Sequence, residues 1–298
     1  MKSLSVHLTD KCNNSCNFCV VNSSQKSKEK VNQKVIYNFL KENAGKGYEC
    51  VNLHGGEPTT IPELLNILED IRGFDYPAVS IQTNARLLKD LEFAKSLVDR
   101  GVDLFVVSLH GKDAAQQDYF TNVEGSFDET VIGIKNVIAL GKKVRTNTVV
   151  CKQNVANLRE IVELAISLGV QHINISAIHP AGKAFKNFHQ VTPHYFEIMD
   201  EVKKAVDFVV EKNITCTLEG FPYCVLGEYE RYMLDWEQNH FKLLYRTTIL
   251  EDYDKFMRNE SCKQVGCCKY CDKLQKCGGV YKEYLLYYGA DEFAAIKE

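Results

Sequence analysis

The sequence has no excess of basic residues and no long apolar segment. Its 298 residues carry 36 Lys and Arg against 39 Asp and Glu, a net charge of −3. The basic surface that attracts nucleic acids is therefore lacking, and we expect no nucleic-acid partner. The longest apolar runs, such as Leu104–Leu109, have the length of a strand, whereas a membrane helix needs about 20 apolar residues. We expect no membrane association.

The N-terminus also lacks the features of a secretion signal. Met1–Val6 contains no apolar h-region, so we expect a cytoplasmic location. The first predicted strand begins at Leu4. We therefore expect neither a leader-peptide-binding domain nor a cobalamin-binding domain ahead of it.

Cysteine, by contrast, is abundant, with twelve residues. In a cytosolic chain of this size, clustered cysteines bind metals or carry out redox chemistry more often than they form disulfides. Three of the twelve lie within residues 12–19 and five within residues 262–277, which predicts two metal sites. Cys50 and Cys151 lie in predicted strands and are expected to be buried, inert thiols.

Strands and amphipathic helices alternate over residues 3–180. Six successive βα units of this kind predict an α/β fold with a parallel sheet and helices outside it. Ser126 and Glu129 form a capping-box pattern at the start of a predicted helix, Phe127–Leu140. The predicted strands are Leu4–Leu8, Cys50–His54, Ala78–Thr83, Asp103–Leu109, Val144–Val150 and His172–Ile178.

Polar residues recur at every second position of these strands. Examples are Ser108 with His110 and Arg145 with Asn147. Buried parallel strands are normally almost continuously apolar, and side chains two positions apart share a face. The pattern therefore predicts one wet face around an open lumen, as in a partial (βα)6 TIM-like barrel. Alternatively, these residues cap helices or bond to neighbouring backbone.

The alternation ends after a helix over Pro193–Lys212 and a strand over Ile214–Leu218. Residues 225–261 are rich in aromatic and charged side chains, which we expect either to pack or to cover a substrate. We predict a barrel core over residues 1–185 and a C-terminal extension over residues 186–298.

The first cysteine cluster has the spacing C-x3-C-x2-C and follows the first strand directly. Cys12, Cys16 and Cys19 supply soft thiolates, which suit iron–sulfur clusters or zinc. Three cysteines leave one iron of a cubane open, whereas a structural zinc site needs a fourth ligand. His7 is the alternative fourth ligand that would make this a zinc site.

This motif, with Phe18 before the last cysteine, resembles the signature of the radical S-adenosylmethionine (SAM) superfamily. Gly55-Gly56-Glu57 after the second strand resembles the family's GGE motif. Asn84, Ser108 and Asn147 stand at the ends of later strands, in the family's order. The sixth strand is followed by His179-Pro180-Ala181-Gly182, which also resembles a sequence feature of the family.

The resemblance implies a [4Fe-4S] cluster on the three cysteines, whose open iron chelates the methionine moiety of SAM. Reductive cleavage would give a 5′-deoxyadenosyl radical, which abstracts a substrate hydrogen atom. Gly55 and Gly56 would let backbone approach the ligand, and Glu57 would accept hydrogen bonds from the SAM ammonium. The further predicted contacts are Phe18 to adenine, and Asn84, Ser108 and Asn147 to the ribose or the carboxylate. Each of these residues has a structural alternative, as a loop anchor or a polar strand end.

The C-terminal cysteines Cys268, Cys271 and Cys277 have the spacing C-x2-C-x5-C. They resemble the start of the SPASM and twitch auxiliary-cluster pattern, except that Tyr281 stands where the next SPASM cysteine is expected. This implies a single auxiliary [4Fe-4S] cluster in a small twitch-like domain, with Cys224 as the fourth ligand. Cys216, Cys262 and Cys267 are the rival fourth ligands, and a zinc site is the alternative.

The resemblance implies an enzyme that modifies a peptide or protein side chain, as many relatives with SPASM or twitch domains do. The alternative is a dehydrogenase or related oxidoreductase that acts on a small-molecule intermediate. A non-enzymatic metal-stabilised binding protein would leave the motif order unexplained. An external electron donor, flavodoxin or ferredoxin, is also implied.

Overall fold

The computed structural model describes residues 2–27, 31–234 and 240–297. Seven strands lie parallel and in chain order, so each of them pairs with the next. The six strands predicted over residues 3–180 are all present, and a seventh follows them. The strands are β1 (Lys2–His7), β2 (Cys50–His54), β3 (Val79–Thr83), β4 (Leu104–Ser108), β5 (Lys143–Val150), β6 (His172–Ala177) and β7 (Thr215–Glu219).

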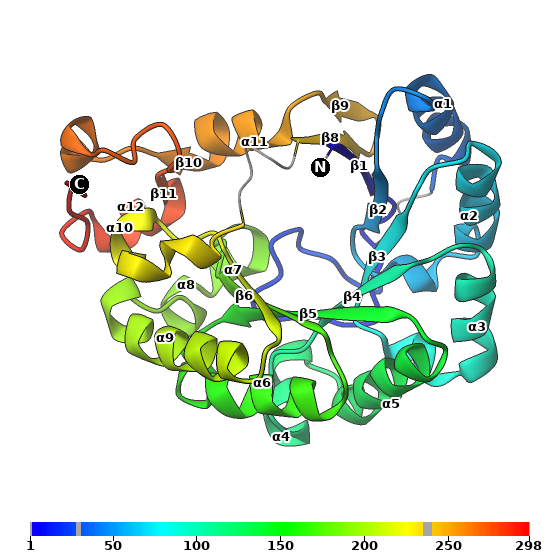
Figure 1. Cartoon of the computed structure of the whole chain (residues 1–298), viewed down its shortest axis with the longest axis horizontal. Coiled ribbons are helices and arrows are strands. Elements are labelled where there is room, and N and C mark those ends of the chain that lie inside the picture. Colours follow the sequence, from blue (N-terminus) through cyan, green and yellow to red (C-terminus); the bar gives the residue numbers. More distant parts are fainter. Residues whose placement is uncertain (1, 28–30, 235–239, 298) are drawn as a thin grey trace.

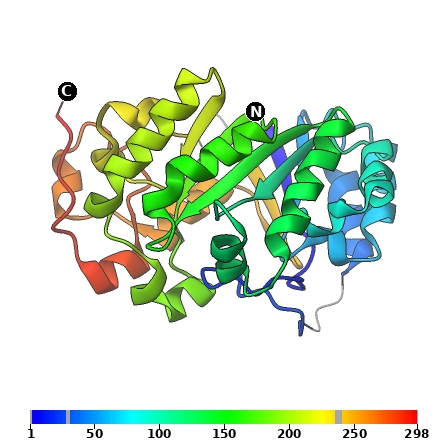
Figure 2. The same cartoon turned by 90° about the horizontal axis from the view of Figure 1, so that it is seen from below.

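The sheet curves around a central space, with its helices on the outer side (Figure 1). Figure 2 turns part of this outer layer of helices toward the viewer. This is the partial TIM-like barrel that the alternating pattern predicted. None of the helices in the described ranges is long and apolar enough to span a bilayer. The outer helices are α1 (Gln33–Asn43), α2 (Leu64–Gly73), α3 (Leu91–Asp99), α4 (Ala114–Thr121), α5 (Ser126–Ala139), α6 (Leu158–Ser167) and α9 (Tyr195–Glu211).

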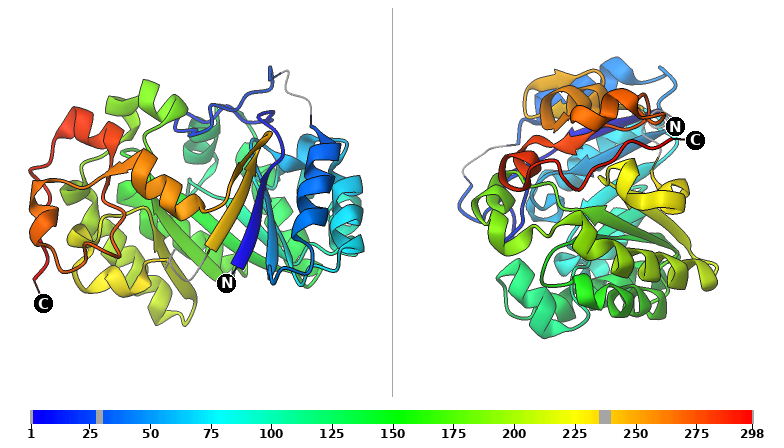
Figure 3. Two further views of the ribbon diagram at one scale, coloured as in Figure 1. Left: turned by 90° about the horizontal axis from the view of Figure 1, so that it is seen from above. Right: turned by 90° about the vertical axis from the view of Figure 1, so that its left-hand side faces the viewer.

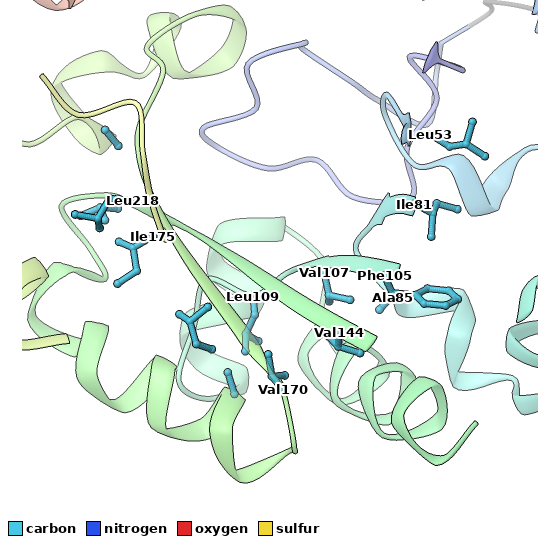
Figure 4. Packing of buried hydrophobic residues seen from close by; sticks show 14 of the residues in the cluster. Leu53, Ile81, Ala85, Phe105, Val107, Leu109, Val144, Val170, Ile175 and Leu218 are labelled. Atoms are coloured by element: carbon cyan, nitrogen blue, oxygen red, sulfur yellow. The ribbon is translucent and has the colours of Figure 1, made fainter. Parts of the chain in front are cut away.

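The hydrophobic core lies between the outer face of the sheet and the helices. In β4, Phe105 and Val107 are fully buried in this core, whereas Val106 and Ser108 line the central space. Figure 4 shows the same layer continuing through Leu53 and Ile81. Because strand side chains alternate between two faces, one face builds the core and the other remains available for a site.

Residues 225–261 contain a strand pair that the sequence analysis did not predict. β8 (His240–Tyr245) lies parallel to β1, and β9 (Thr248–Leu250) pairs with β8 in antiparallel fashion. β8 covers the edge of β1, which would otherwise present unpaired backbone groups. Trp236, also in this aromatic stretch, lies outside the described residues.

The remaining C-terminal elements run from the β8–β9 edge toward the opposite end of the sheet (Figures 1 and 3). β7 and β8 both follow residue 185 yet pair with β6 and β1, so the two predicted parts share one sheet. The division into residues 1–185 and 186–298 stays a prediction. The shorter elements are α7 (Gly182–Lys186), α8 (Phe188–Val191), α10 (Tyr223–Leu226), α11 (Tyr253–Phe256), β10 (Cys262–Lys263), β11 (Val280–Tyr281) and α12 (Lys282–Tyr288).

The predicted capping box at Ser126 is wrong. Gly125 is the N-cap of α5, in a left-handed conformation, and it makes no side-chain cap hydrogen bond. The Asp118 carboxylate, from α4, instead accepts hydrogen bonds from the backbone N–H groups of Gly125 (2.7 Å) and Phe127 (2.9 Å). It also accepts one from the Ser126 hydroxyl (2.7 Å). Asp118, from the preceding helix, therefore caps α5 in place of the predicted capping box at Ser126.

Candidate functional site

A cavity of about 1200 Å³ occupies the centre of the curved sheet. Its walls come from the inner faces of the strands, from the loop after β1, and from C-terminal residues such as Tyr253 and Cys262. Every residue predicted to contact SAM lines this cavity, as do the first three cysteines. These residues are Phe18, Gly55, Gly56, Glu57, Asn84, Ser108, Asn147, Cys12, Cys16 and Cys19.

The loop that carries Cys12, Cys16 and Cys19 is held by backbone hydrogen bonds at both ends. The N–H of Cys12 donates to the carbonyl of Ser24 (3.3 Å). Two of the sulfurs accept backbone hydrogen bonds, Cys12 from Asn14 and Cys19 from Ser23, each at 3.3 Å. Such N–H donors stabilise thiolate ligands of iron–sulfur clusters.

These thiols are held in a desolvated setting. Burial, with a smaller contribution from the Glu57 carboxylate, raises the pKa of Cys12 to about 12. Burial and the adjacent sulfurs of Cys19 and Cys12 raise the pKa of Cys16 above its ordinary value. Buried neighbouring thiols ionise when a metal group replaces their protons. The donor set therefore fits an iron–sulfur cluster.

The zinc alternative required His7 as a ligand. His7 Nε2 instead lies 2.7 Å from Asp10 Oδ1. Within the described parts of the chain, no three His, Cys, Asp or Glu side chains converge as they would around a single metal ion. A four-iron cubane is larger than one ion, so its cysteines need not converge in this way.

Gly55 and Gly56 allow the chain after β2 to lie directly on the cysteine loop. A Cβ atom at Gly55, where φ is +139°, would lie 2.5 Å from the carbonyl oxygen of Thr9. One at Gly56 would lie 2.2 Å from that of Lys11. Both distances are shorter than any van der Waals contact, so only glycine fits. The close approach that the motif predicted is thus made, in the first place, to the chain's own backbone.

Glu57 is 1% exposed and joins the ends of β2 and β3. Its Oε1 accepts hydrogen bonds from Thr83 Oγ1 (2.7 Å) and from both the N–H and the hydroxyl of Thr59 (3.1 and 2.6 Å). Its Oε2 accepts one from the N–H of Asn84 (2.7 Å). Burial raises the pKa of Glu57, and these hydrogen bonds offset part of the shift. Oε2 retains capacity for a further donor from the cavity.

Asn84 and Phe18 both hold the cysteine loop in place. The Asn84 amide donates to Asn13 Oδ1 (2.7 Å), and its oxygen accepts from the N–H of Arg86 (3.0 Å). The Phe18 ring packs edge-on against His110, with a centroid distance of 4.8 Å. These contacts match the structural alternatives considered for both residues, although both also line the cavity.

A polar network crosses the cavity faces of β5, β6 and β7. Asn147 Oδ1 accepts hydrogen bonds from Asn174 (2.7 Å) and Ser176 (2.5 Å). Asn174 also donates to Glu219 Oε2 (3.0 Å) and accepts from Thr217 (2.6 Å). These bonds fix the orientation of the Asn147 amide, with its oxygen toward β6.

Glu219 and Thr217 were missed because β7 was assigned to the C-terminal extension, outside the barrel. The alternation Thr215, Thr217, Glu219 was the available signal. Arg145 Nη2 lies 3.7 Å from Glu219 Oε2, and the buried Nε of Arg145 has no hydrogen-bond partner among the described residues.

A second, smaller cavity is lined by four of the C-terminal cysteines. Cys224, Cys268, Cys271 and Cys277, the predicted auxiliary ligands, all line it. The rival residues do not line it: Cys262 faces the main cavity, and the thiol of Cys267, next to Cys268, contacts the carbonyl of Phe293 at 3.5 Å. Cys216, on β7, is buried in the main hydrophobic core.

The two cavities are neighbours. Tyr223 and Gly279 line both of them. Gly279 has a φ of +93°, and a Cβ atom there would lie 2.6 Å from the carbonyl oxygen of Lys263. The wall is therefore thin at a position that tolerates no side chain.

Comparison with solved structures identifies the fold. The SAM-bound structure of SuiB from Streptococcus suis superposes with a TM-score of 0.70 at 16% identity, over 99% of this chain and 76% of that chain. Native anSMEcpe with bound SAM gives a TM-score of 0.57 at 15% identity, over 95% and 90% of the two chains.

Comparison with protein sequences leads to the family. A probable GTP 3′,8-cyclase from Sulfurisphaera tokodaii is 32% identical over 207 residues, which cover 69% of this chain and 64% of that protein. One from Saccharolobus solfataricus is 34% identical over 185 residues, covering 61% and 58%. The chain spans less than two thirds of the length of these relatives. Residues 6–165 match the radical SAM superfamily. The chain therefore belongs to the radical SAM superfamily, whose enzymes use a [4Fe-4S] cluster and SAM.

Proposed function

We propose that this chain cleaves SAM reductively at a [4Fe-4S] cluster held by Cys12, Cys16 and Cys19. The observation that carries the proposal is that these cysteines share one cavity with Glu57, Asn147 and the other motif residues. When bound there, the cluster would supply an open iron for the methionine moiety and an electron for the cleavage of SAM, and the resulting 5′-deoxyadenosyl radical would abstract a hydrogen atom from the substrate.

The chain's own residues orient SAM and exclude water. Glu57 offers Oε2 to the SAM ammonium, a charge-assisted hydrogen bond. Asn147 presents its amide N–H donors, since its oxygen is already engaged. Ser108 lines the same wall and adds a hydroxyl for the ribose. Gly55, Gly56, Asn84 and Phe18 act mainly by fixing the cysteine loop against this site.

The substrate that we favour is a peptide or protein side chain. Among the described residues, the cavity walls carry three basic side chains, Arg145, Arg258 and Lys276, against five Asp and Glu. Arg258 is already bonded to Asp254 (2.8 Å). Such a cavity poorly complements a triphosphate, whose several negative charges need clustered cations. SuiB, which shares the fold, has been solved with a precursor peptide bound.

A small-molecule substrate is the second candidate. The observation in its favour is the 32% identity to a probable GTP 3′,8-cyclase, which exceeds the identity to the peptide-binding structure. This candidate includes the dehydrogenase alternative derived from the sequence.

We also propose an auxiliary [4Fe-4S] cluster on Cys224, Cys268, Cys271 and Cys277, in a twitch-like extension. The fit rests on their shared cavity. The further partners would be an external flavodoxin or ferredoxin as electron donor, in the cytoplasm.

Replacing Cys12, Cys16 or Cys19 by Ala should abolish formation of 5′-deoxyadenosine from SAM and dithionite, because two thiolates no longer hold the cluster. The measurement is chromatographic quantification after anaerobic reconstitution. Cys216→Ala, in the core of β7, is the matched control and should retain activity. Wild-type rates in the triple Ala variant would refute the proposal.

Glu57→Ala should weaken SAM binding by roughly 1.5–3 kcal/mol, the range for a hydrogen bond to a charged group. It should also lower the free energy of unfolding, because Thr83 and Asn84 lose their buried acceptor. Calorimetric titration with SAM and urea unfolding separate the two effects. An unchanged SAM dissociation constant with reduced stability would restrict Glu57 to a structural role.

Cys271→Ala should halve the iron content, from about eight to about four irons per chain, because each cubane holds four. Cleavage of SAM without substrate should persist. Cys267→Ala is the neighbouring control and should keep all the iron, since Cys267 lies outside the lining of the second cavity. The measurement is metal analysis. One zinc with about four irons in the wild type would show that the four C-terminal cysteines bind zinc instead.

GTP should neither stimulate 5′-deoxyadenosine formation nor be consumed, because the described residues that line the cavity include no cluster of cations. The assay combines reconstituted protein, SAM, dithionite and GTP, with mass-spectrometric detection of nucleotide products. A cyclised guanosine nucleotide would establish the second candidate and exclude the peptide substrate as the favoured one.

A further inference from the structure

The last residues of the chain lie against the second cavity. Ala294 lines it together with the four cysteines. The carbonyl of Ile296 accepts a hydrogen bond from the N–H of Asp272 (3.0 Å), the residue after Cys271. Residues 292–296, which we call the tail, therefore lie alongside the segment that carries Cys271.

Several contacts anchor this tail just before it reaches the cavity. Phe293 is 8% exposed and belongs to the main hydrophobic core. Glu292 accepts a hydrogen bond from the N–H of Phe196 (3.0 Å), lies 2.7 Å from His194 Nδ1, and bonds to the Tyr284 hydroxyl. The course of residues 294–296 is thus set by the packing of Phe293 and by the polar contacts of Glu292.

Two of the four cavity cysteines accept a backbone hydrogen bond at sulfur, and the tail supplies one of them. The N–H of Ile296 donates to Cys271 Sγ (3.4 Å), and that of Gly279 donates to Cys277 Sγ (3.4 Å). Burial raises the pKa of Cys224, and the backbone of Ala294, also in the tail, opposes this shift. Without the tail, Cys271 would lose its donor and Cys224 would lose this opposing backbone group.

We infer that residues 292–296 belong to the auxiliary site, where their backbone N–H groups raise the reduction potential of its cluster. The inference rests on the proposed auxiliary cluster. A cluster becomes more negative on reduction, so N–H donors at its sulfurs stabilise the reduced state and raise the potential. Ala294 and Ile296 are positioning residues that act through backbone groups, and their side chains are dispensable for this role.

The test removes one N–H at a time. Ile296→Pro deletes the donor to Cys271, and Ala294→Pro deletes the backbone N–H beside Cys224, because proline has no N–H. Ile296→Ala keeps the donor and is the matched control. The reduction potential is measured in the whole reconstituted protein by a redox titration followed by electron paramagnetic resonance. The signal that added SAM leaves unchanged belongs to the auxiliary cluster, and the cluster on Cys12, Cys16 and Cys19 serves as an internal reference.

Both Pro variants should shift the auxiliary potential to more negative values, with the reference cluster unmoved and Ile296→Ala like the wild type. Loss of about four irons in the Pro variants alone would also support the inference, because the tail would then be needed to retain the cubane. Full iron with an unchanged potential in both Pro variants would overturn it. A wild-type protein with only one cluster would refute the proposed auxiliary site itself.

Discussion

The structure depends on the close backbone contacts that two glycines, Gly56 and Gly182, make with the cysteine loop. Gly56 lies against Lys11 on one side of the loop, and Gly182 lies against Val20 on the other. A Cβ atom at these glycines would lie 2.2 and 2.3 Å from the respective carbonyl oxygens. The ends of β2 and β6 thereby clamp the loop over the mouth of the curved sheet. Together with the Asn84–Asn13 hydrogen bond, this clamp fixes the loop relative to the strand ends.

The inner face of the sheet stays polar because its groups bond to one another. A sheet lumen filled only by packing would carry branched apolar residues. Here Asn147, Asn174 and Ser176 satisfy one another across β5 and β6, and Glu219 closes the network on β7. Such a network is stable only when nearly all its groups are paired. These polar side chains contribute less packing energy than branched apolar ones would, but they hold hydrogen-bonding groups in fixed orientations around a cavity.

Local pattern predicted the parallel strands β1 to β7, and the resemblance to the family pointed to the cysteine loop and to the four cysteines that share the second cavity. The remainder depended on partners distant in sequence. β8 pairs with β1 across more than two hundred residues, and no local signal in residues 240–245 identifies that neighbour. Glu57 was expected to face a ligand, yet it bonds first to Thr59 and Thr83. Backbone donors such as the N–H of Ile296 leave no trace in the residue type, so no motif could have revealed them.

The thin wall between the two cavities constrains what the molecule can do. Tyr223 and Gly279 are shared by both, and Gly279 cannot accept a side chain without displacing Lys263. Cys277 and Gly279 lie two residues apart, so one short segment supplies both a sulfur of the second cavity and a surface of the first. A change of charge or geometry at those sulfurs therefore reaches the main cavity through a single layer of residues. Gly279 therefore separates the sulfur-lined second cavity from the main cavity, which the first three cysteines line.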